Sequence, residues 1–220
     1  MQADLLTQAR RNMVDCQLRP NRVTDERIIA AMAEVRRELF VPGPLRGVAY
    51  LDEDIALAPG RVMIEPVVFA RMAQAAEIRP GDVVLALGDA SGYVAAVLGR
   101  LAQTVVAVES DGDLAARAQR ALSQCGCEVA AVVTGPLEAG YARQAPYDVI
   151  FVAGAVERVP PALLAQLAEG GRLVAVVNDR EGGRQATLFT RQGGAIGKRP
   201  LFDAATPVLP GFARAPGFVF

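Results

Sequence analysis

The chain contains no histidine, and this absence narrows the chemistry that it can carry out. Every mechanism in which an imidazole activates a serine or a cysteine is excluded. The sequence has only three cysteines, Cys16, Cys125 and Cys127, an odd number that favours reduced thiols over a disulfide framework. Three thiols without histidine are too few soft ligands for a closed zinc site, so we expect no bound metal.

Long apolar runs and an excess of one charge are also missing. No run is long enough to span a membrane, and the opening MQADLLTQARRN lacks the apolar core of a signal peptide. The formal net charge of −1 provides no general attraction to nucleic acid or to an anionic membrane surface. We therefore expect a cytoplasmic protein that binds neither nucleic acid nor membrane, and its oligomeric state stays open.

Apolar residues are plentiful, at 52% of 220, which is enough to build a substantial core. From residue 83 onward, nearly continuous runs of Val, Ile, Leu and Ala alternate with helical segments. Such runs are typical of parallel strands with helices on both sheet faces, and the alternation predicts right-handed βαβ units. We expect strands at 83–87, 104–109, 129–134, 147–155 and 172–178, helices at 93–102, 113–125 and 160–168, and an antiparallel hairpin at 185–202.

The fold class predicted by this order is α/β, a doubly wound sheet of about seven strands with an antiparallel edge hairpin and an N-terminal helical cap. In the cap, Thr24 or Asp25 is placed to begin a helix, and residues 65–78 carry a second helical pattern. Residues 40–60, rich in proline and glycine, are loop-like. The first helix has apolar residues along one face, at Ile28, Met32, Val35 and Leu39.

The chain divides into two regions that we expect to pack as one compact unit. Residues 1–80 form the helical region, and residues 81–220 form the sheet domain. The C-terminal tail DAATPVLPGFARAPGFVF carries three apolar anchors, Phe212, Phe218 and Phe220. We expect this tail to pack on its own sheet, with packing against a second chain as the alternative.

The run VLALGDASG joins an apolar strand to a helix through a glycine loop, a junction that presents backbone N–H groups to a ligand. The dinucleotide pattern G-x-G-x-x-G would place its third glycine on Tyr93. The tighter pattern G-x-G-x-G falls on Gly88, Ala90 and Gly92 and suits S-adenosylmethionine. Glu109 ends the next strand and can accept hydrogen bonds from both ribose hydroxyls. The alternative interpretation is a tight turn between strand and helix, with an exposed glutamate that binds nothing, and the loop by itself favours this alternative. The loop and Glu109 together favour an adenosyl ligand.

These segments resemble the protein-L-isoaspartate O-methyltransferases, a family of S-adenosylmethionine-dependent repair enzymes. The resemblance covers nearly the whole chain, and its most specific part is MVDCQLRPNRVTDERIIAAMAEVRRELFVP. AYLDEDIALAPGRVMIEP is similar to the family's substrate-covering segment. The resemblance implies an S-adenosylmethionine methyltransferase sheet and a protein or peptide substrate bearing isoaspartate. It also implies a set of cofactor-binding residues: Gly88, Asp89, Ser91, Gly92, Tyr93, Glu109 and Gly135.

Several positions depart from the family's pattern in the cofactor site. The family has an acid at Ala86 and a glycine at Ala90, where a methyl group would crowd the cofactor or strain the backbone. Asp89 adds a negative charge beside the expected methionine carboxylate. Gly135 is followed by Pro136, where the family has an acid near the adenine. These changes predict weakened cofactor binding.

The substrate segment departs as well, at the altered catalytic positions Ile64 and Glu65. Ile64 stands where the family has a hydroxyl residue that orients the substrate. An ionised Glu65 facing the site would repel a substrate carboxylate by about 4 kcal/mol at about 4 Å and an effective dielectric near 20. We therefore predict little or no methylation of a plain isoaspartyl peptide.

Three functions follow from these observations. The first is methyl transfer to an isoaspartyl or another carboxylate, which needs alignment and removal of water and no general base. The second is a degenerate pseudoenzyme that acts as a binding or scaffold protein without methyl transfer. The third, an NAD-type oxidoreductase, is disfavoured by the spacing of the loop.

Overall fold

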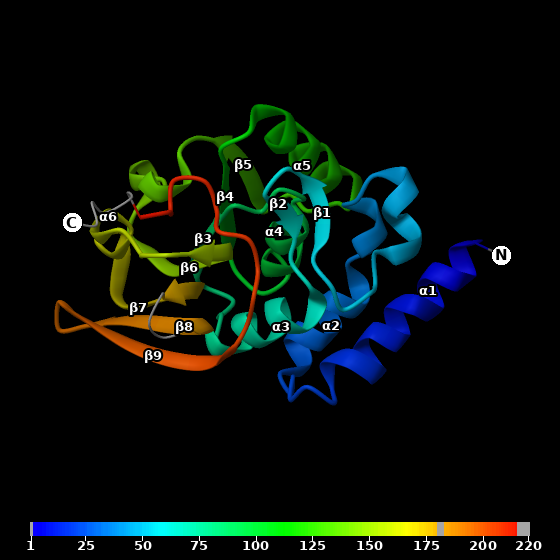
Figure 1. Ribbon diagram of the computed structural model, residues 1–220, viewed down its shortest axis with the longest axis horizontal. Coiled ribbons are helices and arrows are strands. Elements are labelled where there is room, and N and C mark those ends of the chain that lie inside the picture. The colour runs from blue at the N-terminus through cyan, green and yellow to red at the C-terminus, as the bar shows by residue number, and fades with distance from the viewer. Residues whose placement is uncertain (1, 180–182, 215–220) are drawn as a thin grey trace, which may run out of the picture.

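A computed structural model describes residues 2–179 and 183–214 of the chain. Its centre is a seven-stranded sheet in the order β5-β4-β3-β6-β7-β8-β9 (Figure 1). The first five strands in this order run parallel, whereas β8 and β9 form an antiparallel hairpin on the β7 edge. The predicted fold class is confirmed. The strands are β3 (Val83–Leu87), β4 (Thr104–Glu109), β5 (Ala130–Thr134), β6 (Tyr147–Val156), β7 (Leu167–Asp179), β8 (Gly183–Gln192) and β9 (Ala195–Asp203).

The helices between these strands follow the expected order but differ in length. Helix α4 (Tyr93–Leu98) follows β3, and α5 (Gly112–Gln124) follows β4. Helix α6 (Pro161–Leu164) is much shorter than the predicted helix. The reason is that the backbone N–H of Tyr147 donates to the Gln166 carbonyl at 2.8 Å, which draws the chain into the sheet one turn early.

The N-terminal region is helical, as predicted, and contains more helix than the sequence pattern indicated. Helix α2 (Glu26–Glu34) begins at the Asp25 cap, whose side chain accepts a hydrogen bond from the Arg27 N–H at 2.9 Å. It ends before Val35, which is extended. The other segments are α1 (Gln2–Asn12), the π-helical η1 (Met13–Leu18), the 3₁₀ segments η2 (Arg37–Leu39) and η3 (Gly43–Val48), and α3 (Pro66–Ala75).

Two apolar clusters cover the two faces of the sheet. On one face, Ile28 and Met32 of α2 and Phe69 of α3 share a core with Ala86 and Phe151 of the sheet. The helical cap therefore packs directly on the strands that carry the glycine loop. The opposite face is covered by a second cluster that includes Leu85, Leu87, Ile150, Val152, Leu163, Leu209 and Phe212.

The segment predicted as a loop at residues 40–60 contains part of a small hairpin. Strands β1 (Ile55–Ala58) and β2 (Arg61–Met63) pair antiparallel around Gly60, which has a φ of 66°. Positive φ is readily available to glycine, and the turn brings Arg61 back over the large sheet. The hairpin thus corrects the loop expectation and places a charged residue near the glycine loop.

The C-terminal tail packs on its own sheet. The Ala155 N–H donates to the Pro207 carbonyl at 3.0 Å, and the Leu209 N–H donates to the Ala155 carbonyl at 2.9 Å. Phe212 is buried, as predicted, whereas Phe218 and Phe220 lie outside the described residues. Within residues 2–179 and 183–214, no helix is both long enough and apolar enough to cross a bilayer.

Candidate functional site

The candidate site lies at the carboxyl end of β3, an inner strand of the sheet with later strands of the chain on both sides. The chain runs from β3 to β4 and β5 on one side and then returns to β6 on the other. Ligands of open α/β sheets bind at this kind of switch point. Gly88 follows β3, Glu109 ends β4, and Gly154 lies near the end of β6. The Gly88 N–H donates to the Val108 carbonyl at 3.0 Å, which holds the loop to the neighbouring strand.

The glycine loop uses its two glycines for different physical reasons. Gly88 has a φ of 75° and Gly92 a φ of 85°, a region that side chains disfavour. A Cβ on Gly92 would also lie 3.0 Å from the Ala118 carbonyl oxygen. Ala90 does not have a positive φ, so the backbone strain expected at this residue does not occur.

The Asp89 side chain points into the protein and accepts hydrogen bonds from N–H and hydroxyl groups of the loop. Its carboxylate accepts hydrogen bonds from the Ser91 hydroxyl and the Gly92 N–H, both at 2.9 Å, and from the Ala95 N–H at 2.8 Å. Burial raises the pKa of the Asp89 carboxyl, although these hydrogen bonds act against the rise. The expectation that Asp89 presents its charge to a ligand is replaced by a capping role at the start of α4.

Tyr93 begins α4 and points into the core beneath the loop. Its ring packs edge-on against Phe40 and Phe69, with centroid distances of 5.6 and 5.8 Å. The Arg37 guanidinium carbon lies 4.7 Å from the centre of the Tyr93 ring. Tyr93 therefore joins the loop to the N-terminal cap.

Glu109 is where the sequence placed it, but it is not exposed and it is not alone. Its side chain is 1% exposed and forms an ion pair with Arg61, which is 5% exposed. The other carboxylate oxygen accepts the Asp111 N–H at 3.0 Å. Burial raises the pKa of the Glu109 carboxyl, whereas the Asp111 hydrogen bond and the Arg61 charge act in the opposite direction.

Arg61 was not anticipated as a site residue. Its Nη2 atom contacts Glu109 and also donates to the Gly88 carbonyl at 3.1 Å. Its Nε and Nη1 atoms are buried and find no hydrogen-bond partner in the described part of the chain. A buried donor without an acceptor costs about 1–3 kcal/mol. The one sequence signal was that Arg61 is the only charged residue between Asp54 and Glu65.

Leu209 from the tail covers the same region and was also missed. A Cβ built on Gly88 would lie 2.6 Å from the Leu209 Cδ1 atom. A Cβ built on Gly154 would lie 2.7 Å from the Leu209 Cγ atom. The leucine side chain therefore rests directly on the backbone of both glycines, at the switch point.

These contacts decide whether the site fits an adenosyl group. A buried carboxylate at the end of β4 and a glycine turn after β3 are suitable partners for a ribose and its neighbouring groups. In the described arrangement, however, Arg61 occupies Glu109 and the Gly88 carbonyl, and Leu209 covers Gly88. The residues present do not fit an adenosyl ligand in this arrangement. Arg61 has to leave first.

Gly135 lies close to Glu109 but adds no polar side chain. Its N–H donates to the Glu109 carbonyl at 3.0 Å, which ties the end of β5 to the end of β4. Pro136 follows and leads into a short 3₁₀ turn. The parallel sheet thus brings together Gly135 and Glu109, two of the residues that the resemblance assigned to the cofactor site.

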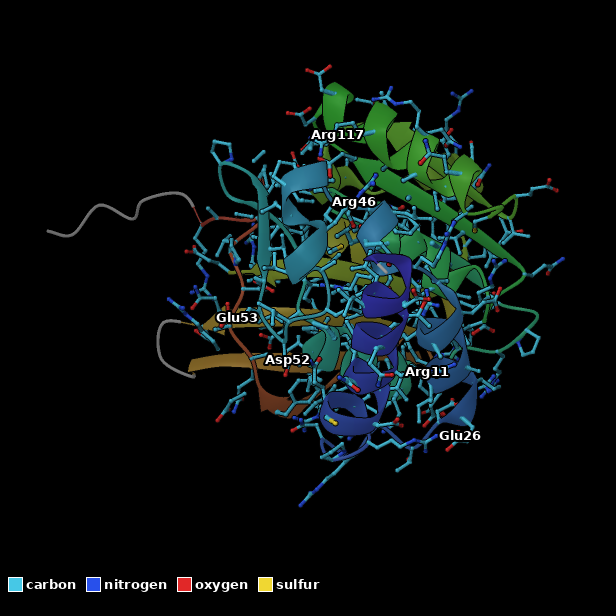
Figure 2. All side chains as sticks on the ribbon, turned by 90° about the vertical axis from the view of Figure 1, so that its right-hand side faces the viewer. Arg11, Glu26, Arg46, Asp52, Glu53 and Arg117 are labelled. Atoms are coloured by element: carbon cyan, nitrogen blue, oxygen red, sulfur yellow. The ribbon has the colours of Figure 1, made fainter. Side chains whose placement is uncertain are left out.

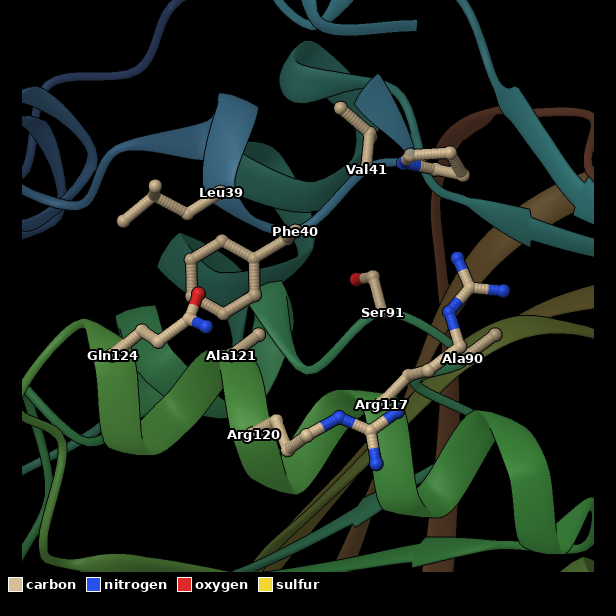
Figure 3. Close-up of a pocket in the computed structure, with 10 residues that line it drawn as sticks. Leu39, Phe40, Val41, Ala90, Ser91, Arg117, Arg120, Ala121 and Gln124 are labelled. Carbon is tan, nitrogen blue, oxygen red and sulfur yellow. The ribbon is translucent and has the colours of Figure 1, made fainter. Parts of the chain in front are cut away.

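A small cavity opens beside the loop (Figure 3). Its volume is about 190 Å³, below the roughly 300–1,000 Å³ of typical small-molecule sites. Ala90 and Ser91 line one side, Phe40 lines another, and Arg117 and Arg120 line it from α5. The cavity therefore leaves the loop partly accessible and is too small for a whole cofactor.

The substrate segment leads from β2 into α3. Ile64 is buried, and its carbonyl accepts a hydrogen bond from the Arg37 Nη2 atom at 2.6 Å. Glu65 precedes α3, and its N–H donates to the Asp54 carboxylate at 2.9 Å. The Val67 N–H donates to a second acid at 3.0 Å, so carboxylates cap the start of this helix.

Half-burial and nearby negative charge change the titration of Glu65. Burial first, and then Asp52 and Asp54, raise the pKa of Glu65 to about 7. Asp52 and Glu53 lie well apart from the basic residues labelled in Figure 2. The repulsion expected from an ionised Glu65 therefore applies to only part of the population at neutral pH.

Comparison with known proteins is consistent with the resemblance found in the sequence. Residues 9–203 match the family described as protein-L-isoaspartate(D-aspartate) O-methyltransferase. A protein-L-isoaspartate O-methyltransferase of Methanoculleus marisnigri is 42% identical over 193 residues, which is 88% of each chain. The protein of the same name from Koribacter versatilis is 43% identical over 195 residues, or 88% of this chain and 87% of that one.

Solved structures with similar folds are consistent with this family match. One named protein-L-isoaspartate O-methyltransferase has a TM-score of 0.81 at 27% identity and covers 92% of this chain and 66% of that chain. A putative member from Plasmodium falciparum, solved with S-adenosyl-L-homocysteine, has a TM-score of 0.77 at 17% identity and covers 92% of this chain and 97% of that one. This second likeness concerns the fold alone. The comparisons give no support to a degenerate pseudoenzyme, and the chain belongs to the protein-L-isoaspartate(D-aspartate) O-methyltransferase family.

Proposed function

We propose that this chain transfers the methyl group of S-adenosylmethionine to the side-chain carboxylate of an isoaspartyl residue in a protein or peptide. The observation that carries the proposal is the family match over residues 9–203, with relatives of that name 42% and 43% identical. The cofactor, when bound, supplies an electrophilic methyl group on a cationic sulfur. Transfer to a carboxylate cancels two opposite charges and needs no general base, so the lack of histidine is no obstacle.

The cofactor-binding roles that we propose follow the carboxyl edge of the sheet. Glu109 would accept the ribose hydroxyls once Arg61 has left it. The turn from Gly88 to Gly92 would lie beside the methionine end. Gly135, whose N–H is bonded to the Glu109 carbonyl, would leave space for the adenine. Ser91, Asp89 and Tyr93 would act by fixing the turn, because their polar or aromatic groups face other parts of the chain.

The substrate-side roles are proposed for Ile64 and Glu65. The buried Ile64 side chain would exclude water from the reacting carboxylate. A neutral Glu65 carboxyl can donate a hydrogen bond to that carboxylate, whereas an ionised Glu65 repels it. The raised pKa of Glu65, about 7, supports a neutral fraction at physiological pH.

The wider organisation also remains a proposal. We propose that residues 1–80 cover the substrate and that residues 81–220 form the methyltransferase domain. The shared core of α2, α3 and the sheet supports their packing as one unit. The cytoplasm is the compartment that we propose.

Transfer of labelled methyl groups to an isoaspartyl peptide tests this function. The matched control is the same peptide with ordinary aspartate. Labelling confined to the isoaspartyl peptide is the expected result. This replaces the expectation of little or no methylation, because a pKa of about 7 leaves part of Glu65 neutral and so reduces its repulsion of the substrate carboxylate. Equal labelling of both peptides would point to a different carboxylate substrate. No labelling at saturating cofactor, with binding of the cofactor demonstrated separately, would contradict the proposed reaction.

A further inference from the structure

We propose that Arg61 is a built-in competitor for the adenosyl ribose, so that the chain binds its cofactor only in exchange for this guanidinium. The proposal rests on the proposed function, because it concerns how tightly the same site takes its cofactor. It assigns to Arg61 the role of an affinity-determining residue, and neither the family match nor the names of the relatives include such a role.

The first support is the pair of atoms that Arg61 occupies. Its Nη2 atom contacts the Glu109 carboxylate and also lies 3.1 Å from the Gly88 carbonyl oxygen. The Glu109 carboxylate is the group that would accept the ribose hydroxyls, and Gly88 opens the turn beneath the ligand. One side chain therefore covers both ends of the ribose position.

The second support is that Arg61 is poorly satisfied where it lies. Its side chain is only 5% exposed, yet Nε and Nη1 have no hydrogen-bond partner among residues 2–179 and 183–214. An arginine evolved as a permanent structural ion pair is normally held by a fork of several hydrogen bonds. Release into water would give these two nitrogens partners, which lowers the cost of displacement.

The third support is the element that carries Arg61. The residue begins β2, a strand of three residues whose one partner is the four-residue β1. This two-stranded hairpin is not part of the seven-stranded sheet. Arg61 is therefore held by no strand pairing with the large sheet, and its guanidinium can turn away from Glu109 and Gly88 without breaking a strand pair of that sheet.

The competition concerns the ribose and not the sulfur. Every ligand that contains adenosine has to displace the same guanidinium, whatever group follows its ribose. Removal of Arg61 should therefore strengthen the binding of adenosine and of S-adenosylhomocysteine by a similar factor. A residue that merely shaped the methionine end would affect S-adenosylhomocysteine alone.

Isothermal titration of the full chain with S-adenosylhomocysteine and with adenosine tests the proposal. Arg61→Gln should bind both ligands at least tenfold more tightly than the parent. Arg46→Gln, which removes an exposed arginine of η3 and the same formal charge, should bind as the parent does. Addition of Glu109→Gln to Arg61→Gln should abolish the gain, because the ribose then loses its carboxylate.

The outcomes separate this proposal from the proposed function. Equal affinity of the parent and Arg61→Gln would overturn the competition while leaving the methyltransferase function in place. No heat from any variant at millimolar ligand would overturn the competition and remove the cofactor on which the proposed function depends. If the Arg61→Gln variant does not fold, the Arg61→Lys variant tests the proposal in its place. Its single ammonium should hold Glu109 less well and tighten binding at least threefold, and unchanged affinity would overturn the proposal.

Discussion

The buried Asp89 carboxylate accepts a hydrogen bond from the Ala95 N–H at 2.8 Å and so closes the glycine turn onto the first turn of α4. The same carboxylate accepts the Gly92 N–H at 2.9 Å. Asp89, which the sequence pattern placed beside the ligand, thus stabilises the loop from within the protein. Hydrogen bonds from the Ala90, Ser91 and Gly92 N–H groups to acceptors within the loop fix its shape.

Replacement of Asp89 by alanine should lower the free energy of unfolding by about 2–3 kcal/mol. The change removes a helix cap and leaves buried N–H groups of the loop without acceptors. Urea denaturation measures the loss. Asp113→Ala, at an exposed acid in the first turn of α5, is the control and should change stability by less than about 0.5 kcal/mol. Equal effects of the two substitutions would show that Asp89 has no special role.

Glu65 should make the stability of the protein depend on pH. Its folded-state pKa, about 7, is raised above the value near 4.5 of an unperturbed glutamate, so the folded chain binds more protons than the unfolded chain between these values. Stability should therefore fall as pH rises from about 4.5 to about 7 and then level off. After allowance for solvent screening at this half-buried group, we expect a fall of about 1–2 kcal/mol.

Glu65→Gln isolates this contribution. The variant should be more stable than the parent at pH 8 and should have a flatter profile between pH 4.5 and 7, as measured by denaturation at a series of pH values. Glu128→Gln, at an exposed position, should follow the parent. A parent profile that rises over this pH range, with no flattening in Glu65→Gln, would refute the assignment.

Methyl transfer should respond to the same titration. If Glu65 faces the substrate carboxylate, its ionisation adds a repulsion of up to about 4 kcal/mol, so labelling of an isoaspartyl peptide should decrease as pH rises through about 7. Glu65→Gln should relieve the loss at pH 8 and have little effect at pH 6. Equal rates of the parent and the variant at both pH values would show that Glu65 is not near the reacting groups.

The tail should be energetically coupled to the sheet through Leu209 and Gly154. A Cβ on Gly154 would lie 2.7 Å from the Leu209 Cγ atom, so Gly154→Ala should destabilise the protein by about 1–3 kcal/mol. Leu209→Ala in the same chain should recover part of this loss, which makes the two changes non-additive. Gly81→Ala, where an added Cβ meets nothing within 4 Å, is the control and should be close to neutral. Strict additivity at Gly154 and Leu209 would contradict the packing.

The sheet could be predicted because each of its inner strands is a continuous apolar run, long enough to be recognised without its neighbours. The hairpin at residues 55–63 could not, since its strands have four and three residues and surround a proline-glycine turn. Helix α6 was predicted too long because the local sequence pattern favours helix as far as Gln166. In the structure the Gln166 carbonyl accepts a hydrogen bond from the Tyr147 N–H, and this long-range contact ends the helix early.

The site was predictable to the extent that it follows from topology. Glu109 ends β4 and Gly88 directly follows the adjacent parallel strand β3, so strand order alone brings them together. The partner of Glu109 could not be predicted, because Arg61 lies 48 residues away and reaches it only through the hairpin. In the same way, the raised pKa of Glu65 depends on acids that the loop folds around it.

A crystal structure of the full chain with S-adenosylhomocysteine tests the central claim most directly. We predict the ribose hydroxyls on the Glu109 carboxylate, with the Arg61 guanidinium displaced from both Glu109 and the Gly88 carbonyl. A ligand bound elsewhere, or a ribose seated at this edge of the sheet with the Arg61–Glu109 ion pair intact, would contradict the account.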